Sequence, residues 1–430
     1  MRKFLYITPY FPPQSRVGAL RPLKFARHLP ACGWSPVVLC DLWPSAGINL
    51  ELLSKVPPNT AVLRRYSRRA EAAEQQMHQA MTPVSRHRNP GSAHLKRLSA
   101  LVPKWLNNPE LIPLGEHSVH IPHAIAAAEQ ALKAHPECEA ILVNADPYAA
   151  LLVGAAVARR SGLPLVQDLR DPWSVCELRR PRRPALIRRF VDRLERYAFD
   201  AASKVVLNTE TALRDTVAHY EGVLPAARFT SIRNHGDRAL IGSGEHPGFD
   251  RFTMLFLGNF RRFLEGDVLL KVLKSLKERG VNASQLQLVV TGSLPESARQ
   301  KATELGVDEL LVGHPFAAYT EIGPVMRAAD VLVALSNRST QRVPAKFYDY
   351  ILAERPILAI SENPEFGGLV QAAGGEMFGM DEPERIADAL QTLMRKGRLQ
   401  TVARSTSALS SEEASAHMAS VLNEVTSAKG

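Results

Sequence analysis

The feature that most constrains the fold is an alternation of short apolar runs with helical patterns, which occurs twice along the chain. The first series places strands at residues 4–8, 36–40, 139–144, 163–168 and 203–207, and the second at 252–257, 286–290, 310–312, 331–335 and 357–360. Strands that alternate with helices form parallel sheets covered on both faces. The sequence therefore predicts an α/β protein with two doubly wound, Rossmann-like domains.

A stretch dense in turn residues, from Asn234 to Gly248, separates the two series and indicates a linker. We expect an N-terminal domain at residues 1–240, a linker at 241–250, a C-terminal domain at 251–405, and a C-terminal helix at 406–430 that packs back on the N-terminal domain. Residues 66–120 fit no strand–helix unit and are expected to form a basic insertion with short helices. Two such domains bind ligands in a cleft where the carboxyl ends of both sheets face each other.

Composition indicates a globular intracellular protein. The 430 residues are 45% hydrophobic and 22% charged, and no apolar run is long enough to span a bilayer. The first residues lack the features of a signal peptide. The four cysteines are far apart and lack metal-type spacing, as in a cytoplasmic chain with free thiols.

The net charge of +10 is concentrated in the first half of the chain. Nucleic acid is disfavoured as a partner because no recognition motif accompanies the charge. An anionic membrane surface fits better: residues 186–194 place apolar side chains at helical spacing beside arginines, as in an interfacial helix. This favours a peripheral protein on the inner face of the membrane. An ordinary core face for the helix and a merely solvated basic surface are the alternatives.

A loop, a short helix and an apolar strand follow one another at residues 343–360. Lys346 and Asp349 bring a cation and a carboxylate near the start of the expected helix. A helix N-terminus attracts phosphate, and a carboxylate one turn later can accept ribose hydroxyls. This arrangement could hold a nucleotide diphosphate.

The motifs together resemble those of the GT-B glycosyltransferases, in particular the retaining family 4 branch of polysaccharide, glycolipid and capsule assembly. The segment from Pro9 to Arg21 is similar to that branch's first glycine loop, and Asp168 to Ser174 to its Asp-x-Arg-Asp-x-Trp loop. Residues 232–237 resemble the turn that closes its first domain, with one extra residue. Residues 257–259 resemble a phosphate loop, and residues 343–360 its donor motif.

The resemblance implies a metal-independent hexosyltransferase that moves sugar from a nucleotide-sugar co-substrate, without another cofactor, to a glycan, lipid-linked or small-molecule acceptor. The donor-binding candidates are Gly18, Gly258, Asn259, Arg262, Gly292, His314, Pro315, Pro344, Lys346 and Asp349. The catalytic candidates are Asp171, Arg261 and Lys346. Arg21, Asp146, Arg170 and Trp173 are the acceptor-side candidates.

Several candidates have structural alternatives. Asp171 could act near the acceptor hydroxyl or cap a helix, and Trp173 could stack on an acceptor ring or fill the core. Arg261 and Arg262 could neutralise a diphosphate or be solvated. Lys346 could bind phosphate or steady its loop. Gly18 and the loop at 313–316 could be simple turns, and Asp349 a helix-terminal acid.

The chain also departs from the family pattern. Gln341 stands where an acid is usual, Asp349 replaces a glutamate, Glu265 replaces a lysine, and a common histidine is missing from residues 144–148. A carboxylate beside a diphosphate would repel it. Two alternative functions follow: a GT-B sugar-nucleotide epimerase, against which the long basic insertion argues, and a non-catalytic nucleotide-sugar-binding protein.

Overall fold

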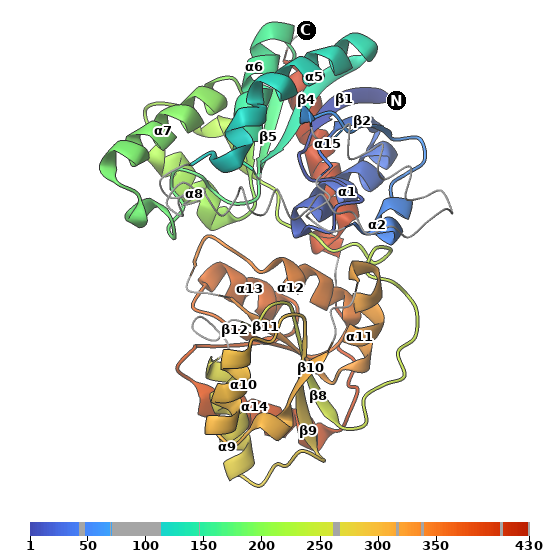
Figure 1. Cartoon of the computed structure of the whole chain (residues 1–430), viewed down its shortest axis with the longest axis vertical. Coiled ribbons are helices and arrows are strands. Elements are labelled where there is room, and N and C mark those ends of the chain that lie inside the picture. The colour runs from blue at the N-terminus through green and yellow to red at the C-terminus, as the bar shows by residue number, and fades with distance from the viewer. Residues whose placement is uncertain are drawn as a thin grey trace, which may run out of the picture. The chain divides into compact units, whose positions relative to one another are not determined.

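The computed structural model describes residues 1–42, 48–68, 70, 113–145, 147–260, 267–314, 318–336, 339–404 and 407–428. The chain divides into two compact units (Figure 1). Unit 1 comprises residues 1–233 and 415–430, and unit 2 comprises residues 234–414. Within the described ranges, no helix has the length and apolarity needed to cross a bilayer.

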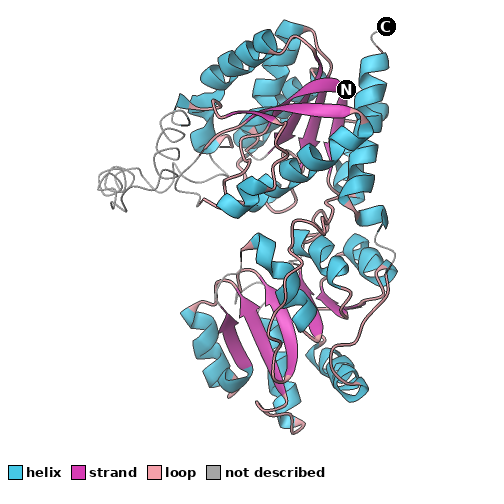
Figure 2. Cartoon of the chain, turned by 90° about the vertical axis from the view of Figure 1, so that its right-hand side faces the viewer, coloured by secondary structure: helices cyan, strands magenta, loops and turns pink. Residues whose placement is uncertain are grey.

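Unit 1 contains a parallel sheet of seven strands in the order β3-β2-β1-β4-β5-β6-β7. Figure 2 shows the strands in magenta and the helices in cyan. The central strands are largely buried; Phe4, Leu5, Tyr6 and Ile7 of β1 are all fully buried, as expected for strands covered on both faces. The strands are β1 (Arg2–Ile7), β2 (Trp34–Leu39), β3 (Ala61–Leu63), β4 (Cys138–Ala145), β5 (Leu165–Leu169), β6 (Lys204–Leu207) and β7 (Phe229–Ser231).

Helices cover this sheet, and the last helix of the chain contributes to the same unit. The helices are α1 (Leu20–His28), α2 (Leu50–Ser54), α5 (Ile121–Ala134), α6 (Ala149–Ser161), α7 (Ala185–Asp200), α8 (Glu210–His219) and α15 (Ser411–Ser427). Met418 and Leu422 of α15 are fully buried. The Trp34 indole donates to Asn423 Oδ1 at 3.0 Å, and Arg2 Nη2 donates to Thr426 Oγ1 at 2.6 Å. These contacts join α15 to the start of unit 1.

Unit 2 contains a second parallel sheet, with six strands in the order β10-β9-β8-β11-β12-β13. Its strands are β8 (Phe252–Leu257), β9 (Leu286–Thr291), β10 (Leu311–His314), β11 (Val331–Leu335), β12 (Ile357–Ile360) and β13 (Glu376–Phe378). Its helices are α9 (Asp267–Glu278), α10 (Glu296–Glu304), α11 (Ile322–Ala328), α12 (Ala345–Tyr350), α13 (Pro364–Ala372) and α14 (Pro383–Lys396).

The two sheets confirm the prediction of two doubly wound domains. The strand order reverses at β1/β4 in unit 1 and at β8/β11 in unit 2. The carboxyl ends of strands at such a reversal are where ligands bind in open α/β sheets. Each unit therefore has one edge at which a ligand site is expected.

Residues 234–250, which the sequence divides between the N-terminal domain and a linker, belong to unit 2. Leu240 and Ile241 are fully buried, and Gly323 N donates to the Ile241 carbonyl at 2.7 Å. Gly242 has a φ of +82°, and a Cβ there would overlap the carbonyl oxygen of Thr320. Apolar burial and close backbone packing therefore join this turn-rich stretch to the C-terminal unit. Most of the predicted insertion at 66–120 lies outside the described residues.

Candidate functional site

The donor candidates of unit 2 lie at the carboxyl ends of its strands, around the strand-order reversal. Gly258 follows β8, Gly292 follows β9, and α12 follows β11. Because β8 and β11 are neighbours and parallel, the loop after β8 and the segment leading into α12 leave the same edge of the sheet. Three segments that are distant in sequence therefore begin at one place.

The backbone conformation at positions 258 and 292 requires glycine. Their φ angles are +115° and +147°, which side chains rarely adopt. A Cβ on Gly292 would lie 2.5 Å from the carbonyl oxygen of Gly258, so the two loops pass each other in direct contact. Lys346 Nζ lies 3.8 Å from the position that a Cβ on Gly258 would occupy. The structure thus brings Gly258, Gly292 and Lys346 together.

The lysine and its helix are held by contacts with the sheet. The Lys346 ammonium lies 3.6 Å from the centroid of the Phe256 ring, within the range of a cation–π interaction. Leu257 N donates to the Tyr350 hydroxyl at 2.9 Å, and that hydroxyl donates to the Val333 carbonyl at 3.2 Å. These bonds fix α12 against β8 and β11. Pro344 is the residue before α12.

Asp349 is buried, with 6% of its surface exposed, and its Oδ1 accepts a hydrogen bond of 2.7 Å from the Tyr319 hydroxyl. It lies late in α12, a helix of six residues with no acid in its first turn. The alternative that Asp349 is a helix N-terminal acid is therefore wrong. Gln341, at a position where the family usually has an acid, is also buried.

Of the other donor candidates, the structure describes some and not others. Asn259 is exposed directly after Gly258. His314 ends β10 and is half-buried. Burial lowers the pKa of His246, and the nearby imidazole of His314 lowers this pKa further. Arg261, Arg262, Pro315 and the acceptor-side candidate Asp146 lie outside the described residues, as does Glu265.

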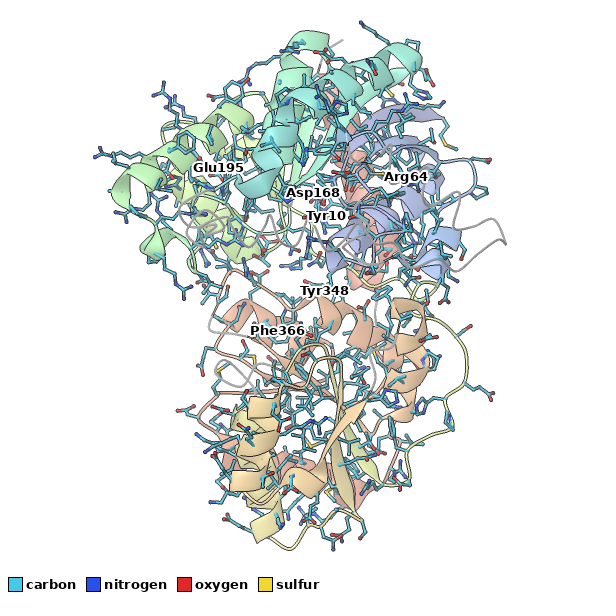
Figure 3. The ribbon with its side chains drawn as sticks, in the orientation of Figure 1. Tyr10, Arg64, Asp168, Glu195, Tyr348 and Phe366 are labelled. Carbon is cyan, nitrogen blue, oxygen red and sulfur yellow. The ribbon has the colours of Figure 1, made fainter. Side chains whose placement is uncertain are left out.

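In unit 1, Arg21 lies in a buried ion pair. Its Nε and Nη2 donate to the two carboxylate oxygens of Asp168, both at 2.8 Å, and Asn144 donates to the same carboxylate. Figure 3 labels Asp168 among the side chains of this unit. Arg21 also donates to the backbone carbonyls of Ile232 and Arg233, each at 2.9 Å. Arg21 is only 4% exposed. The expectation that it lines the acceptor side is corrected: it joins α1, β5 and the end of the first domain.

Trp173 requires a similar correction. Its side chain is fully buried and stacks on Tyr148, with 5.0 Å between ring centroids and an interplanar angle of 6°. An acceptor ring cannot reach a side chain in this position, so the alternative in which Trp173 fills the core is the one observed. Asp171 and Arg170, which precede it, are half-buried.

Gly18 and Arg170 meet at the carboxyl edge of the first sheet. A Cβ on Gly18 would lie 2.7 Å from Tyr10 Cδ2 and 3.2 Å from Arg170 Nη1. The Tyr10 ring in turn packs edge-on against His117, with centroids 6.4 Å apart. The structure thus brings together the first glycine loop, the loop after β5 and a histidine that the sequence reasoning missed.

A buried carboxylate fixes the loop that carries Arg170 and Asp171. Glu195 of α7 accepts hydrogen bonds from Ser174 N at 3.1 Å, from Ser174 Oγ and from the Tyr220 hydroxyl at 2.8 Å. Burial raises the pKa of Glu195 above its usual range. Arg183 Nη1 donates to the Trp173 carbonyl at 2.9 Å. The backbone after Asp171 therefore has one defined position.

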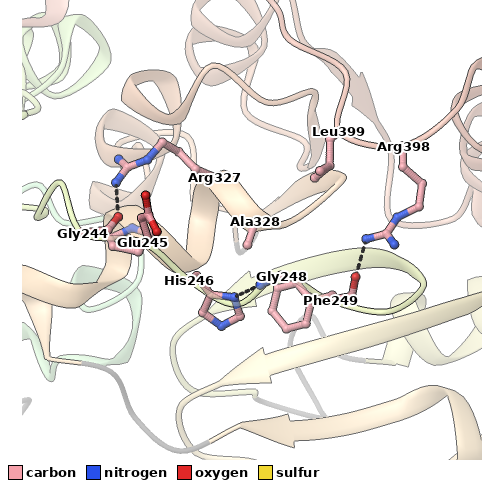
Figure 4. Close-up of a pocket in the computed structure, with 10 residues that line it drawn as sticks. Gly244, Glu245, His246, Gly248, Phe249, Arg327, Ala328, Arg398 and Leu399 are labelled. Atoms are coloured by element: carbon pink, nitrogen blue, oxygen red, sulfur yellow. Dashed lines mark hydrogen bonds between the residues drawn. The ribbon is translucent and has the colours of Figure 1, made fainter.

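A separate pocket of about 360 Å³ lies in unit 2 between the 244–249 segment, α11 and residues 398–399 (Figure 4). Arg398 Nη2 donates to the Phe249 carbonyl at its rim. Ala328, which also lines the pocket, lies just before the amino end of β11, whereas Gly258 follows the carboxyl end of β8. The pocket therefore lies at the opposite edge of the sheet from the donor candidates and contains none of them.

Comparison with solved structures defines the class of fold. The HepE protein of Anabaena, solved in complex with UDP, matches with a TM-score of 0.55 and 14% identity over 100% of this chain and 98% of its own. Sucrose-phosphate synthase of Thermosynechococcus elongatus matches with a TM-score of 0.57 and 11% identity, over 100% and 98%. A putative UDP-N-acetylglucosamine 2-epimerase of Listeria monocytogenes matches with a TM-score of 0.59 and 10% identity, over 98% and 96%. The chain has the GT-B fold.

Two curated proteins are similar in sequence, whereas no family model matches. D-inositol 3-phosphate glycosyltransferase 1 of Catenulispora acidiphila is 25% identical over 59% of this chain and 63% of its own length. D-inositol 3-phosphate glycosyltransferase of Corynebacterium efficiens is 28% identical over 46% and 50%. The chain thus spans less than two thirds of these relatives. The resemblance to GT-B glycosyltransferases inferred from the motifs is confirmed by these comparisons.

Tyr10, His117, Glu195 and Tyr319 are the site neighbours that the motifs did not indicate. Tyr319 and Asp349 are 30 positions apart, and Glu195 is 21 positions from Ser174. No known sequence motif relates these residues to their partners by a fixed spacing. The one available signal was that Tyr10 lies inside the first glycine-loop segment.

Proposed function

We propose that this chain is a retaining glycosyltransferase that moves a sugar from a nucleotide-sugar donor to a glycan, lipid-linked or small-molecule acceptor. The observation that carries the proposal is the convergence of Gly258, Gly292 and Lys346 at the strand-order reversal of unit 2. Glycine at both positions lets the backbone approach a diphosphate closely, and the lysine ammonium offsets its charge.

The chemistry of transfer fits these residues. The departing nucleoside diphosphate gains negative charge as the sugar leaves, and a positioned cation stabilises that charge. Lys346 would take this role, and the resemblance to the family implies that Arg261 and Arg262 share it. Asp349 would accept the ribose hydroxyls, and Asp171 with Arg170 would lie near the acceptor. In this proposal the reaction needs no metal and no cofactor besides the nucleotide sugar.

The similar proteins suggest substrates to test first. The Anabaena structure contains UDP, and the curated relatives are named for D-inositol 3-phosphate. A UDP-sugar donor and a phosphorylated cyclitol acceptor are therefore the first pair to try, with lipid-linked and glycan acceptors next.

Nucleotide binding tests the donor site. Isothermal titration calorimetry with UDP, GDP, ADP and CDP should identify a nucleoside diphosphate that binds the wild-type protein. Lys346→Ala should weaken its binding about tenfold or more, because a charge-assisted contact to phosphate is lost. Asp349→Ala should also weaken it. Lys396→Ala, which removes an exposed lysine of α14, is the matched control and should change nothing. Unchanged affinity in Lys346→Ala and Asp349→Ala would show that the site is elsewhere.

We further propose that the protein acts at the inner face of a membrane, in polysaccharide or glycolipid assembly, and contacts anionic lipid through the outer face of α7. Val191, Ala198 and Phe199 of this helix are buried, whereas Leu186 and Phe190 are 76% and 48% exposed. Arg189 and Arg193 are exposed beside them. Apolar side chains interleaved with arginine on one exposed face suit an anionic lipid surface.

Two of the arginines just before α7 do not belong to this exposed surface. Arg183 is 3% exposed, and Arg180 donates to Asp192 at 2.7 Å. These two arginines hold the loop before α7 and are unsuited to lipid contact. The arginines that support the membrane proposal are Arg182, Arg188, Arg189 and Arg193.

A further inference from the structure

Tyr319 and Asp349 form a hydrogen-bonded pair between two segments of unit 2. Tyr319 begins a 3₁₀ turn at Tyr319–Glu321, after β10, and Asp349 belongs to α12. The Tyr319 hydroxyl lies 2.7 Å from Asp349 Oδ1, a short distance for a phenol donating to a carboxylate. This pair thus links the segment that follows His314 to the helix that carries Lys346.

The segment that carries Tyr319 has a rigid support. Ala318 N donates to Glu321 Oε2 at 3.1 Å, which closes the start of the 3₁₀ turn. The Thr320 carbonyl packs against Gly242 so closely that no side chain would fit there. Gly323 N donates to the Ile241 carbonyl at 2.7 Å. Because the backbone on both sides of the tyrosine is fixed, its hydroxyl is presented at a constant place.

The chemistry of the pair sets the orientation of the carboxylate. An ionised carboxylate only accepts hydrogen bonds, and the Tyr319 hydroxyl, which donates to Oδ1, constrains which way the group turns. Burial raises the pKa of Tyr319 well above its usual value, and the charge of Asp349 raises it further, so the hydroxyl keeps its proton and remains a donor. Asp349 is also shorter than the glutamate of the family pattern, so its position depends on what holds it.

We propose that Tyr319 is a positioning residue that orients the Asp349 carboxylate to accept the ribose hydroxyls of a bound nucleotide. This inference rests on the proposed function, because it assumes that a nucleotide binds beside Lys346. According to this proposal, Tyr319 contributes to the preference of the site for nucleotides with ribose over nucleotides that lack the ribose hydroxyls. A purely structural tyrosine would give the protein stability but no such discrimination.

The test compares nucleotides that differ only in the ribose hydroxyls. UDP, GDP, ADP and CDP and their 2′,3′-dideoxy counterparts are titrated calorimetrically into the wild-type protein and into Tyr319→Phe. The substitution removes only the hydroxyl. We expect it to weaken binding of the ribonucleotide about tenfold and to leave binding of the dideoxy analogue nearly unchanged. The preference for ribose should then fall by the same factor.

Tyr350→Phe is the matched control. It removes another buried hydroxyl of α12, which accepts a hydrogen bond from Leu257 N and donates one to the Val333 carbonyl. We expect it to lower the melting temperature and to affect both forms of the nucleotide equally. If Tyr319→Phe also affects both forms equally, or neither, Tyr319 does not act through the ribose, although the donor site stands. If the wild-type protein binds no nucleoside diphosphate, the proposed function fails and this inference fails with it.

Discussion

At the scale of single residues, burial decides what a polar side chain does in this protein. Arg21 and Asp168 are both buried and neutralise each other through two hydrogen bonds, so their pairing offsets the cost of desolvation. Glu195 is equally buried, but its partners Ser174 and Tyr220 are neutral hydrogen-bond donors. Its charge is therefore not offset by a cation in direct contact.

Glu195 should make stability depend on pH in a definite direction. Because burial raises its pKa above the ordinary value of 4.5, the folded protein keeps a proton that the unfolded chain loses as the pH rises. The folded state is then penalised, by about 1.4 kcal/mol for each unit of pKa shift, as the pH passes from the unfolded to the folded pKa. Glu195→Gln cannot ionise, so its melting temperature relative to the wild type should rise as the pH increases above the ordinary pKa of 4.5.

Thermal unfolding of both proteins across this range checks the prediction, with Glu221→Gln, at an exposed position, as the control. A difference that stays constant, or that falls as the pH rises, would mean that the hydrogen bonds to Glu195 outweigh its burial.

The sequence predicted some site residues better than others, for a physical reason. Glycines directly after strands and a lysine at the start of a short helix are recognisable because few other roles suit them, and Gly258, Gly292 and Lys346 do lie together. Arg21 and Trp173 were placed on the acceptor side, but an arginine or tryptophan near a strand end has the same neighbours in sequence whether it faces solvent or the core. The Tyr319–Asp349 contact depends on tertiary packing alone.

At the scale of elements, the sequence predicts the inner strands of both sheets and the edge strand β10, but not the other three edge strands. The strands β8, β11 and β12 have the bounds that the sequence indicated. The strands β3, β7 and β13 were missed; each has three residues and lies at the edge of its sheet. Such strands form because a neighbouring strand offers free backbone groups, and no local pattern in their own sequence specifies them.

For helix α7, too, the sequence alone does not determine which apolar side chains are buried. Its apolar stripe was consistent with a core face or with an interfacial helix, and the structure divides it between the two. Ile187 and Leu194 pack against the core, whereas Leu186 and Phe190 are exposed. The spacing of apolar residues predicts that a helix has an apolar face. The neighbouring elements decide which residues of that face are covered.

Co-sedimentation with phosphatidylglycerol vesicles tests the proposed lipid contact of α7. We expect binding that weakens as salt is added, because each arginine near an anionic surface contributes about 1 kcal/mol. Replacing Arg182, Arg188, Arg189 and Arg193 by Gln should reduce binding at least about tenfold, and Leu186→Ser with Phe190→Ser should reduce it further. Leu399→Ser, which alters an exposed leucine of unit 2, is the control. Full binding by the arginine variant would exclude this face as the contact.

At the scale of the whole molecule, the chain is two sheet domains with the last helix returned to the first. Residues 415–430 group with unit 1 although residues 234–414 precede them. On the unit 2 side, Gly236 and Ser410 pair in a parallel bridge, so the two segments that join the units lie against each other there. Unit 1 is therefore completed by residues distant in sequence, whereas unit 2 is one continuous segment.

Turnover tests the central claim, that this GT-B chain transfers sugar rather than binding or isomerising a nucleotide sugar. Purified protein is incubated with a panel of UDP-, GDP- and ADP-sugars and with D-inositol 3-phosphate, lipid-linked and glycan acceptors, and nucleoside diphosphate and products are measured by mass spectrometry. We predict acceptor-dependent release of nucleoside diphosphate together with a glycosylated acceptor, both lost in Lys346→Ala. Conversion of one nucleotide sugar into another without an acceptor, or tight donor binding with no release, would contradict the claim.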